Sequence, residues 1–109
     1  MLKVLFWIYT LLICFLSFYP VPQTPTSDKL NHFIAFLVFA ILLRLTYKTG
    51  YWAVFIYSLL FGIFIEIVQY FLPYRSSELQ DVVADLFGTL SGMFLYSVFD
   101  LSKDILKQK

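Results

Sequence analysis

The stretch from Glu66 to Gly92 reads EIVQYFLPYRSSELQDVVADLFGTLSG and decides how the rest of the chain is organised. It places five charged side chains, one proline and two glycines between and inside two very apolar segments. The proline and the polar residues after it predict a tight turn. The stretch is therefore expected to be two helix ends joined by this turn, with their charged residues gathered at one end of the fold.

The overall composition is that of a membrane protein. Of the 109 residues, 61% are hydrophobic and 14% are charged, whereas about a quarter of the residues in a soluble domain are charged. Such a chain cannot cover its surface with polar groups, so its apolar side chains must face the lipid bilayer. Cys14 is the only cysteine, which excludes a disulfide within the chain. The lack of a basic stripe argues against nucleic-acid binding.

The apolar segments predict an all-α, integral membrane four-helix bundle in a single domain, residues 1–109. Each segment is close to the roughly 20 residues that a helix needs to cross a bilayer. The expected helices are residues 2–19, 28–46, 52–72 and 80–99. Ser27 or Asp28 is expected to cap the second helix, and Pro73 to stop the third. The polar tail, residues 100–109, is expected at the membrane surface, where it could continue the fourth helix.

The distribution of lysine and arginine predicts the orientation of the bundle, because these residues favour the cytoplasmic side. Six of them fall on the side that carries both termini, and Lys29 and Arg75 fall on the other. We therefore expect both termini to be cytoplasmic. The Glu66–Gly92 turn would then face outward.

Periodicity places the unusual polar residues on single helix faces. Glu66 and Gln69 are three residues apart and share one face of the third helix. A carboxylate at this depth is costly in lipid, so Glu66 is expected to face the bundle interior and either to be paired there or to have a raised pKa. On the fourth helix, spacings of four, three and four place one set of residues on one face: Asp81, Asp85, Gly88 and Gly92. The two glycines are expected to allow close helix packing.

The second helix adds further polar residues at the same end. His32 is the only histidine and lies one turn from Asp28, which could orient its ring. Arg75 lies in the turn, where Glu66 or Asp81 could be its bidentate partner. The predicted ligand-binding residues are Asp28, Lys29, His32, Glu66, Gln69, Arg75, Asp81 and Asp85.

If the site catalyses a reaction, Glu66 and His32 are the candidates for a general acid or base. The sequence contains no nucleophile motif, phosphate loop or zinc-protease motif. No metal or other cofactor is predicted, although the carboxylates could recruit a hard divalent cation. Whether a reaction occurs at all is left open by the residues alone.

Two motifs made of these residues resemble those of the VanZ-like family of small bacterial membrane proteins. The first, D-K-x-x-H, corresponds to residues 28–32, and the family's usual tyrosine four residues later is Phe36 here. The second, E-x-x-Q-x-F-x-P-x-R followed by D, a polar residue, G and G, corresponds to residues 66–92. Tyr74 stands where glycine is common, and Asp85 stands where asparagine is common. The resemblance covers residues 26–95.

The resemblance implies a multi-pass protein of the bacterial cytoplasmic membrane. It also implies a role in the cell envelope, because the family is associated with reduced susceptibility to the glycopeptide teicoplanin. The first hypothesis is that the outward-facing site engages an envelope lipid or a lipid-linked precursor. A second hypothesis is a small proton-coupled carrier, in which Glu66 and Gln69 would serve as a relay. The third is a structural or assembly subunit, in which the polar residues only lock the bundle and a protein partner binds elsewhere.

Overall fold

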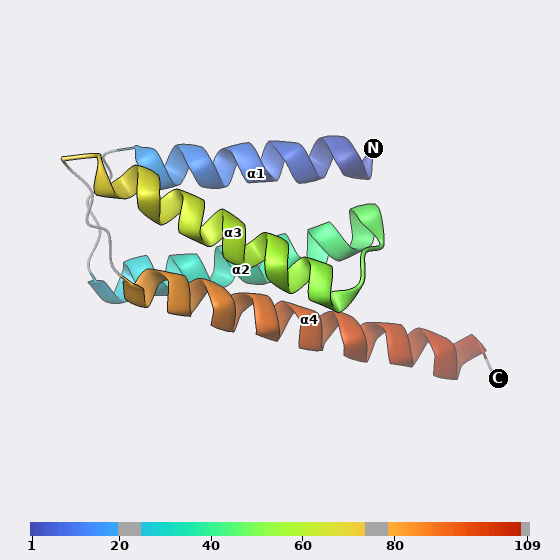
Figure 1. The fold of residues 1–109 in the computed structure, drawn as a ribbon. Coiled ribbons are helices and arrows are strands. Elements are labelled where there is room, and N and C mark those ends of the chain that lie inside the picture. Colours follow the sequence, from blue (N-terminus) through green and yellow to red (C-terminus); the bar gives the residue numbers. More distant parts are fainter. Residues whose placement is uncertain (20–24, 74–78, 108–109) are drawn as a thin grey trace.

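The computed structural model describes the backbone of residues 1–19, 25–73 and 79–107, with side chains for the same ranges except residues 25–28. Over these ranges the chain folds into successive antiparallel α-helices (Figure 1). The helices are α1 (Leu2–Phe18), α2 (Pro25–Tyr47), α3 (Tyr51–Tyr70) and α4 (Leu79–Lys107). The bundle is elongated, with extents of 56 × 27 × 22 Å. The prediction of an all-α four-helix fold is confirmed.

Helices α2 and α3 lie between α1 and α4. The most extensive packing is that of α4 along α2, and α4 also packs against α3, while α1 packs on α2 and α3 (Figure 1). The C-terminal ends of α1 and α3 and the N-terminal ends of α2 and α4 lie together at one end of the bundle. Residues 66–69 and 81–85 therefore come to the same end as the start of α2.

Glycines bring α4 close to α2. A Cβ atom on Gly88 would overlap the carbonyl oxygen of Phe33, and one on Gly92 would lie 2.5 Å from the carbonyl oxygen of Leu37. These distances are shorter than real Cβ contacts, so only glycine allows this backbone approach. The two glycines, four residues apart, form the small-residue face that membrane helices use for close packing.

The centre of the bundle is aromatic. Phe36 and Phe39 from α2 stack on Phe61 from α3, with ring centroids 5.6 and 5.0 Å apart, respectively. Phe6 from α1 closes the group against Phe39 at 5.3 Å. This apolar core lies directly below the polar residues, because Phe36 is one turn further along α2 than His32.

The outer surface is apolar, as a membrane protein requires. Three helical segments are long and apolar enough to cross a membrane: Lys29–Tyr47, Tyr51–Tyr70 and Leu79–Lys107. Helix α1 is also apolar but has only 17 residues. Large side chains such as Trp7, Leu60 and Phe94 are more than half exposed and can contact lipid. The protein is a multi-pass membrane protein.

The second and third helices begin and end at different residues from those expected. Helix α2 starts at Pro25 rather than residue 28, because proline is well suited to the first position of a helix, where its missing N–H is not needed. Helix α3 starts at Tyr51 and ends at Tyr70, before the expected Leu72. Its last turn tightens through bonds from Phe71 and Leu72 to carbonyls three residues back, and the residue before a proline disfavours helical geometry.

The outer helices agree more closely, except at the C-terminal end of the chain. Helix α1 ends one residue earlier than expected, at Phe18. Helix α4 starts at Leu79 and continues to Lys107, well beyond the expected end at residue 99. Aspartates followed three residues later by lysines support this polar extension: Asp100 with Lys103, and Asp104 with Lys107.

The opposite end of the bundle is basic and aromatic. The Arg44 guanidinium donates to the carbonyl of Thr49 at 2.6 Å and lies over the rings of Tyr51 and Tyr96, 5.0 and 5.3 Å from their centroids. The Trp7 indole donates to the Tyr47 hydroxyl at 2.8 Å. Amphipathic aromatic side chains of this kind are typical of the membrane–water interface.

Candidate functional site

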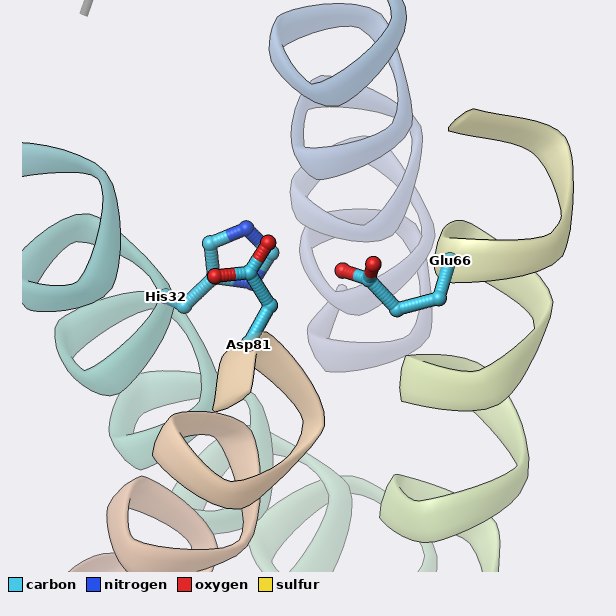
Figure 2. A group of neighbouring side chains, drawn as sticks. All are labelled: His32, Glu66 and Asp81. Carbon is cyan, nitrogen blue, oxygen red and sulfur yellow. The ribbon is translucent and has the colours of Figure 1, made fainter. Parts of the chain in front are cut away.

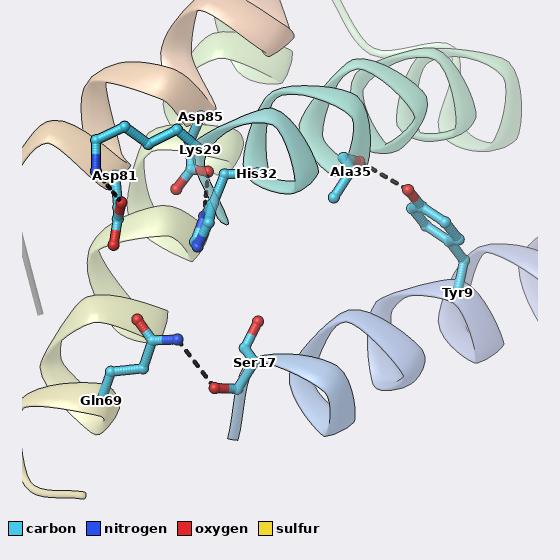
Figure 3. A network of polar contacts seen from close by, with 8 residues as sticks. All are labelled: Tyr9, Ser17, Lys29, His32, Ala35, Gln69, Asp81 and Asp85. Carbon is cyan, nitrogen blue, oxygen red and sulfur yellow. Dashed lines mark hydrogen bonds and ion pairs between the residues drawn. The ribbon is translucent and has the colours of Figure 1, made fainter. Parts of the chain in front are cut away.

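A group of buried polar side chains gathers at the end of the bundle away from Arg44. We call it the polar cluster, and among the described side chains it consists of Lys29, His32, Glu66, Gln69, Asp81 and Asp85. Its members come from α2, α3 and α4 (Figures 2 and 3). Every member except Lys29 is at least nine-tenths buried. Six of the eight residues predicted to bind a ligand are thus brought together.

The histidine is held by an aspartate from another helix. His32 Nδ1 lies 2.7 Å from Asp85 Oδ1, and both side chains are buried (Figure 3). Because an ionised carboxylate only accepts, the imidazole donates from Nδ1, and Nε2 is its other ring nitrogen. Gly62 provides room for this pair, since a Cβ there would be 2.8 Å from Asp85 Oδ2.

This pairing identifies a role for Asp85, which stands where asparagine is common in the motif that the sequence resembles. Asp85 binds His32 across the α2–α4 interface. Its carboxylate therefore makes a charge-assisted hydrogen bond to the imidazole, which a neutral asparagine side chain at this position would not make. A carboxylate at the far nitrogen of a histidine makes the other nitrogen a better base or ligand. The spacing of Asp28 and His32 had suggested a different orienting residue, and the side chain of Asp28 lies outside the described residues.

Asp81 is the other buried aspartate of α4, and it pairs with Lys29. The Lys29 ammonium lies 3.3 Å from Asp81 Oδ1, with the aspartate 1% exposed and the lysine side chain 29% exposed. The second oxygen, Oδ2, is buried and accepts no hydrogen bond from any residue that the structure describes. Arg75, the partner expected from the sequence, lies outside the described residues.

Glu66 faces the same centre from α3. Its carboxylate points toward the ring of His32 and the carboxylate of Asp81 (Figure 2). Each of these three residues offers a donor atom, and the three donor atoms all lie within 4.8 Å of one another. The expectation that Glu66 faces the bundle interior is confirmed, since only 7% of the residue is exposed.

Gln69 connects the cluster to α1. Its side-chain amide donates to the backbone carbonyl of Ser17 at 2.9 Å, and the glutamine is 1% exposed (Figure 3). The carbonyls in the last turn of a helix have no partner within the helix, so this bond satisfies one of them in α1. Sequence periodicity placed Gln69 beside Glu66 but could not identify a backbone partner 52 residues away.

An apolar groove opens beside the cluster, between α3 and α4. It has a volume of about 480 Å³, within the range of ligand pockets. Its lining consists of Ile63, Glu66, Ile67, Tyr70, Phe71, Leu79 and Val82. Glu66 is the charged member of this lining, so the same carboxylate belongs to the groove and to the polar cluster.

Sequence reasoning missed two buried hydroxyl groups. Ser58 on α3 and Thr89 on α4 are both fully buried, and their hydroxyl oxygens have no hydrogen-bond partner among the described residues. Ser58 lies one turn before Gly62 and two turns before Glu66. The spacing of four residues from Ser58 to Gly62 to Glu66 was the available signal.

Comparison with known proteins gives one family. The chain matches the family described as VanZ/LLP1 over residues 6–100, which covers most of α1, all of α2 and α3, and most of α4. No curated protein and no solved structure matches the chain. The matched range includes the polar cluster, the groove and the two glycines that face α2. This multi-pass membrane protein therefore belongs to the VanZ/LLP1 family.

Proposed function

We propose that this protein binds a lipid-linked component of the bacterial cell envelope, at the end of the bundle that holds the polar cluster. The observation that carries this proposal is the double position of Glu66, which lines the apolar groove and also belongs to the buried cluster. An amphipathic lipid fits this arrangement, because its chain can lie in the groove while its polar head reaches Glu66.

The free-energy cost of buried ionisable groups supports a function for the polar cluster beyond helix packing. Ionisable groups inside membrane helices are expensive, and they usually mark binding or transport sites. Here Glu66, Asp81 and Asp85 are all at least nine-tenths buried, and they lie at one end of the bundle. The opposite half of the core is aromatic. Beyond the polar cluster, the buried polar side chains among the described residues carry hydroxyl groups and are not ionisable, which disfavours the carrier hypothesis.

The proposal includes an orientation. Both termini lie in the cytoplasm, and the polar cluster faces outward across the cytoplasmic membrane. The basic and aromatic end, with Arg44 and Lys3 each close to a tyrosine ring, supports this, because lysine and arginine favour the cytoplasmic side. An outward site can meet the lipid-linked precursors to which glycopeptides bind, and we propose that its occupancy lowers teicoplanin susceptibility.

The orientation predicts the result of a reporter fusion. We expect a reporter that is active only in the cytoplasm to be active when it is fused after Lys109, and an exported-only reporter to be inactive there. A matched pair fused after Pro22, in the segment between α1 and α2, should give the reverse pattern. An exported reporter that is active after Lys109 would contradict the orientation.

Glu66→Gln tests the lipid-binding proposal. We expect this change to weaken binding of a sugar-bearing isoprenoid-phosphate lipid by at least about tenfold, because a hydrogen bond from a sugar hydroxyl to the charged carboxylate of Glu66 contributes about 1.5–3 kcal/mol. Binding would be measured in nanodiscs by native mass spectrometry, and teicoplanin susceptibility would be measured in cells with matched membrane levels of each variant. The expected cellular result is loss of the protein's effect on susceptibility.

Asp104→Asn is the control for that experiment. Asp104 is an exposed carboxylate on α4, far along the helix from the cluster, so this change should leave binding and susceptibility as they are in the unmodified protein. If Glu66→Gln behaved like Asp104→Asn in both assays, the cluster would be a structural lock, and the assembly hypothesis would take its place.

A further inference from the structure

Among the side chains that the structure describes, three carboxylates and one imidazole lie buried in the polar cluster, with one lysine beside them. Buried charges are costly unless they are paired or coordinate a metal. Carboxylate oxygens and imidazole nitrogens are also the donor atoms that divalent transition metals bind. The composition of the polar cluster therefore suits a metal site.

The donor atoms already converge. His32, Glu66 and Asp81 each offer a donor atom, and all three lie within 4.8 Å of one another (Figure 2). A tetrahedral zinc ion about 2.0–2.2 Å from each ligand needs donors roughly 3.4 Å apart. The distances between the donor atoms must therefore shorten by at most about 1.4 Å. Rotation of the Glu66 side chain can supply a shift of this size.

An unpartnered oxygen points to a ligand at the same place. Asp81 is 1% exposed, and its Oδ2 has no hydrogen-bond partner among the residues that the structure describes. The Asp81 carboxylate lies next to the His32 ring and faces the Glu66 carboxylate (Figure 2). A buried carboxylate oxygen of this kind is expected to have a partner, and a cation at the centre of the three residues would provide it.

The surroundings of His32 match those of a metal ligand. Histidines that bind metals almost always donate their other ring N–H to a carboxylate, a carbonyl or water. His32 does so to Asp85 at 2.7 Å, and Nε2 lies at the far side of the ring from Asp85 (Figure 3). Asp85 thus acts as a positioning residue and not as a ligand. Its carboxylate fixes both the tautomer and the orientation of the imidazole.

We infer that His32, Glu66 and Asp81 form a binding site for a divalent transition-metal ion, with Asp85 positioning the histidine. One imidazole and two carboxylates suit Zn²⁺ or Mn²⁺. Three protein ligands leave a coordination position open, as in zinc sites that bind a further group. If the proposed function holds, on which this step rests, the open position would accept a phosphate oxygen of the lipid head.

Zinc titration of the purified protein tests the site. The full chain carries an affinity tag without histidines, is stripped with a chelator in detergent, and is then titrated with Zn²⁺ against a fluorescent chelator. We expect one Zn²⁺ per chain. Because His32 is the only histidine, ¹⁵N-histidine labelling yields one imidazole, and its Nε2 resonance should shift as Zn²⁺ binds.

Near-isosteric variants separate this site from adventitious binding. Glu66→Gln and Asp81→Asn should each weaken Zn²⁺ binding by more than about 100-fold, and Asp85→Asn by about 10–100-fold, as for other residues that position ligands. Asp104→Asn should bind like the unmodified chain. Circular dichroism of each variant would establish that it is folded.

The outcomes distinguish this inference from the proposed function. If the folded, unmodified chain takes up neither Zn²⁺ nor Mn²⁺, or if Glu66→Gln and Asp81→Asn bind Zn²⁺ as tightly as Asp104→Asn, the metal site is wrong. These measurements contain no lipid, so they do not test lipid binding. Metal binding without any lipid binding would overturn only the proposed function.

Discussion

Gly88→Ala is expected to destabilise the protein by about 3 kcal/mol, near the upper end of what an overpacked site usually costs. The added methyl group would overlap the backbone carbonyl of Phe33 on α2. A side chain could rotate away, but a backbone oxygen within a helix cannot move without shifting the whole of α2. The α2–α4 interface is the most extensive in the bundle, so α4 must move outward and lose packing along its length.

The measurement is equilibrium unfolding in mixed micelles, followed by circular dichroism. Gly50→Ala is the matched control, because a Cβ at Gly50 would meet no atom within 4 Å. The free energy of unfolding of Gly50→Ala should lie within about 1 kcal/mol of that of the unmodified protein. Gly50 precedes α3, so the substitution changes only the capping of this helix. Equal stability of the two alanine variants would mean that α2 and α4 are further apart than described.

Breaking the His32–Asp85 pair is the second change with a large expected effect. We expect His32→Leu to cost about 3 kcal/mol, because the buried Asp85 carboxylate then loses its hydrogen-bond donor, and an unsatisfied charged group costs more than the about 1–3 kcal/mol of a neutral one. The pair is short, at 2.7 Å, and both side chains are buried. Adding Asp85→Leu should recover part of the loss, because the remaining carboxylate is then removed from the apolar interior.

A double-mutant cycle gives the size of the interaction. The stabilities of His32→Leu, Asp85→Leu and the double variant would be measured in the same micelles, and the coupling energy should be about 2 kcal/mol. Neutral hydrogen bonds between membrane helices average about 0.6 kcal/mol. A coupling energy near that lower figure would indicate a neutral bond, and a value near zero would contradict the pairing.

The fold was predictable from the sequence because each helix is an apolar segment of membrane-spanning length. The ends of the helices were less predictable, because one residue type, such as proline, can either begin a helix or interrupt it. The second helix was expected from residue 28 but begins at Pro25, and the helix expected over residues 80–99 continues through the polar tail to Lys107. Composition identifies where a helix leaves the apolar layer, but not where its hydrogen bonds stop.

The membership of the candidate site was predictable, whereas its pairings were not. Helical spacing places Glu66 and Gln69 on one face, and Asp81 and Asp85 on another, without any knowledge of the neighbouring helices. The choice of Asp85 as partner of His32 depends on how far α4 slides along α2. That register is set by the close approach at Gly88, which no spacing within one helix reveals.

The division of the polar cluster among α2, α3 and α4 has a consequence for biosynthesis. A membrane helix that enters the bilayer alone must carry its own polar residues into lipid, and here the aspartates that pair with Lys29 and His32 are on the last helix to be synthesised. Helices α2 and α3 must therefore stay sheltered near the insertion machinery until α4 emerges. A chain arrested before α4 would expose unmatched polar groups, which makes it a natural target for membrane quality-control proteases.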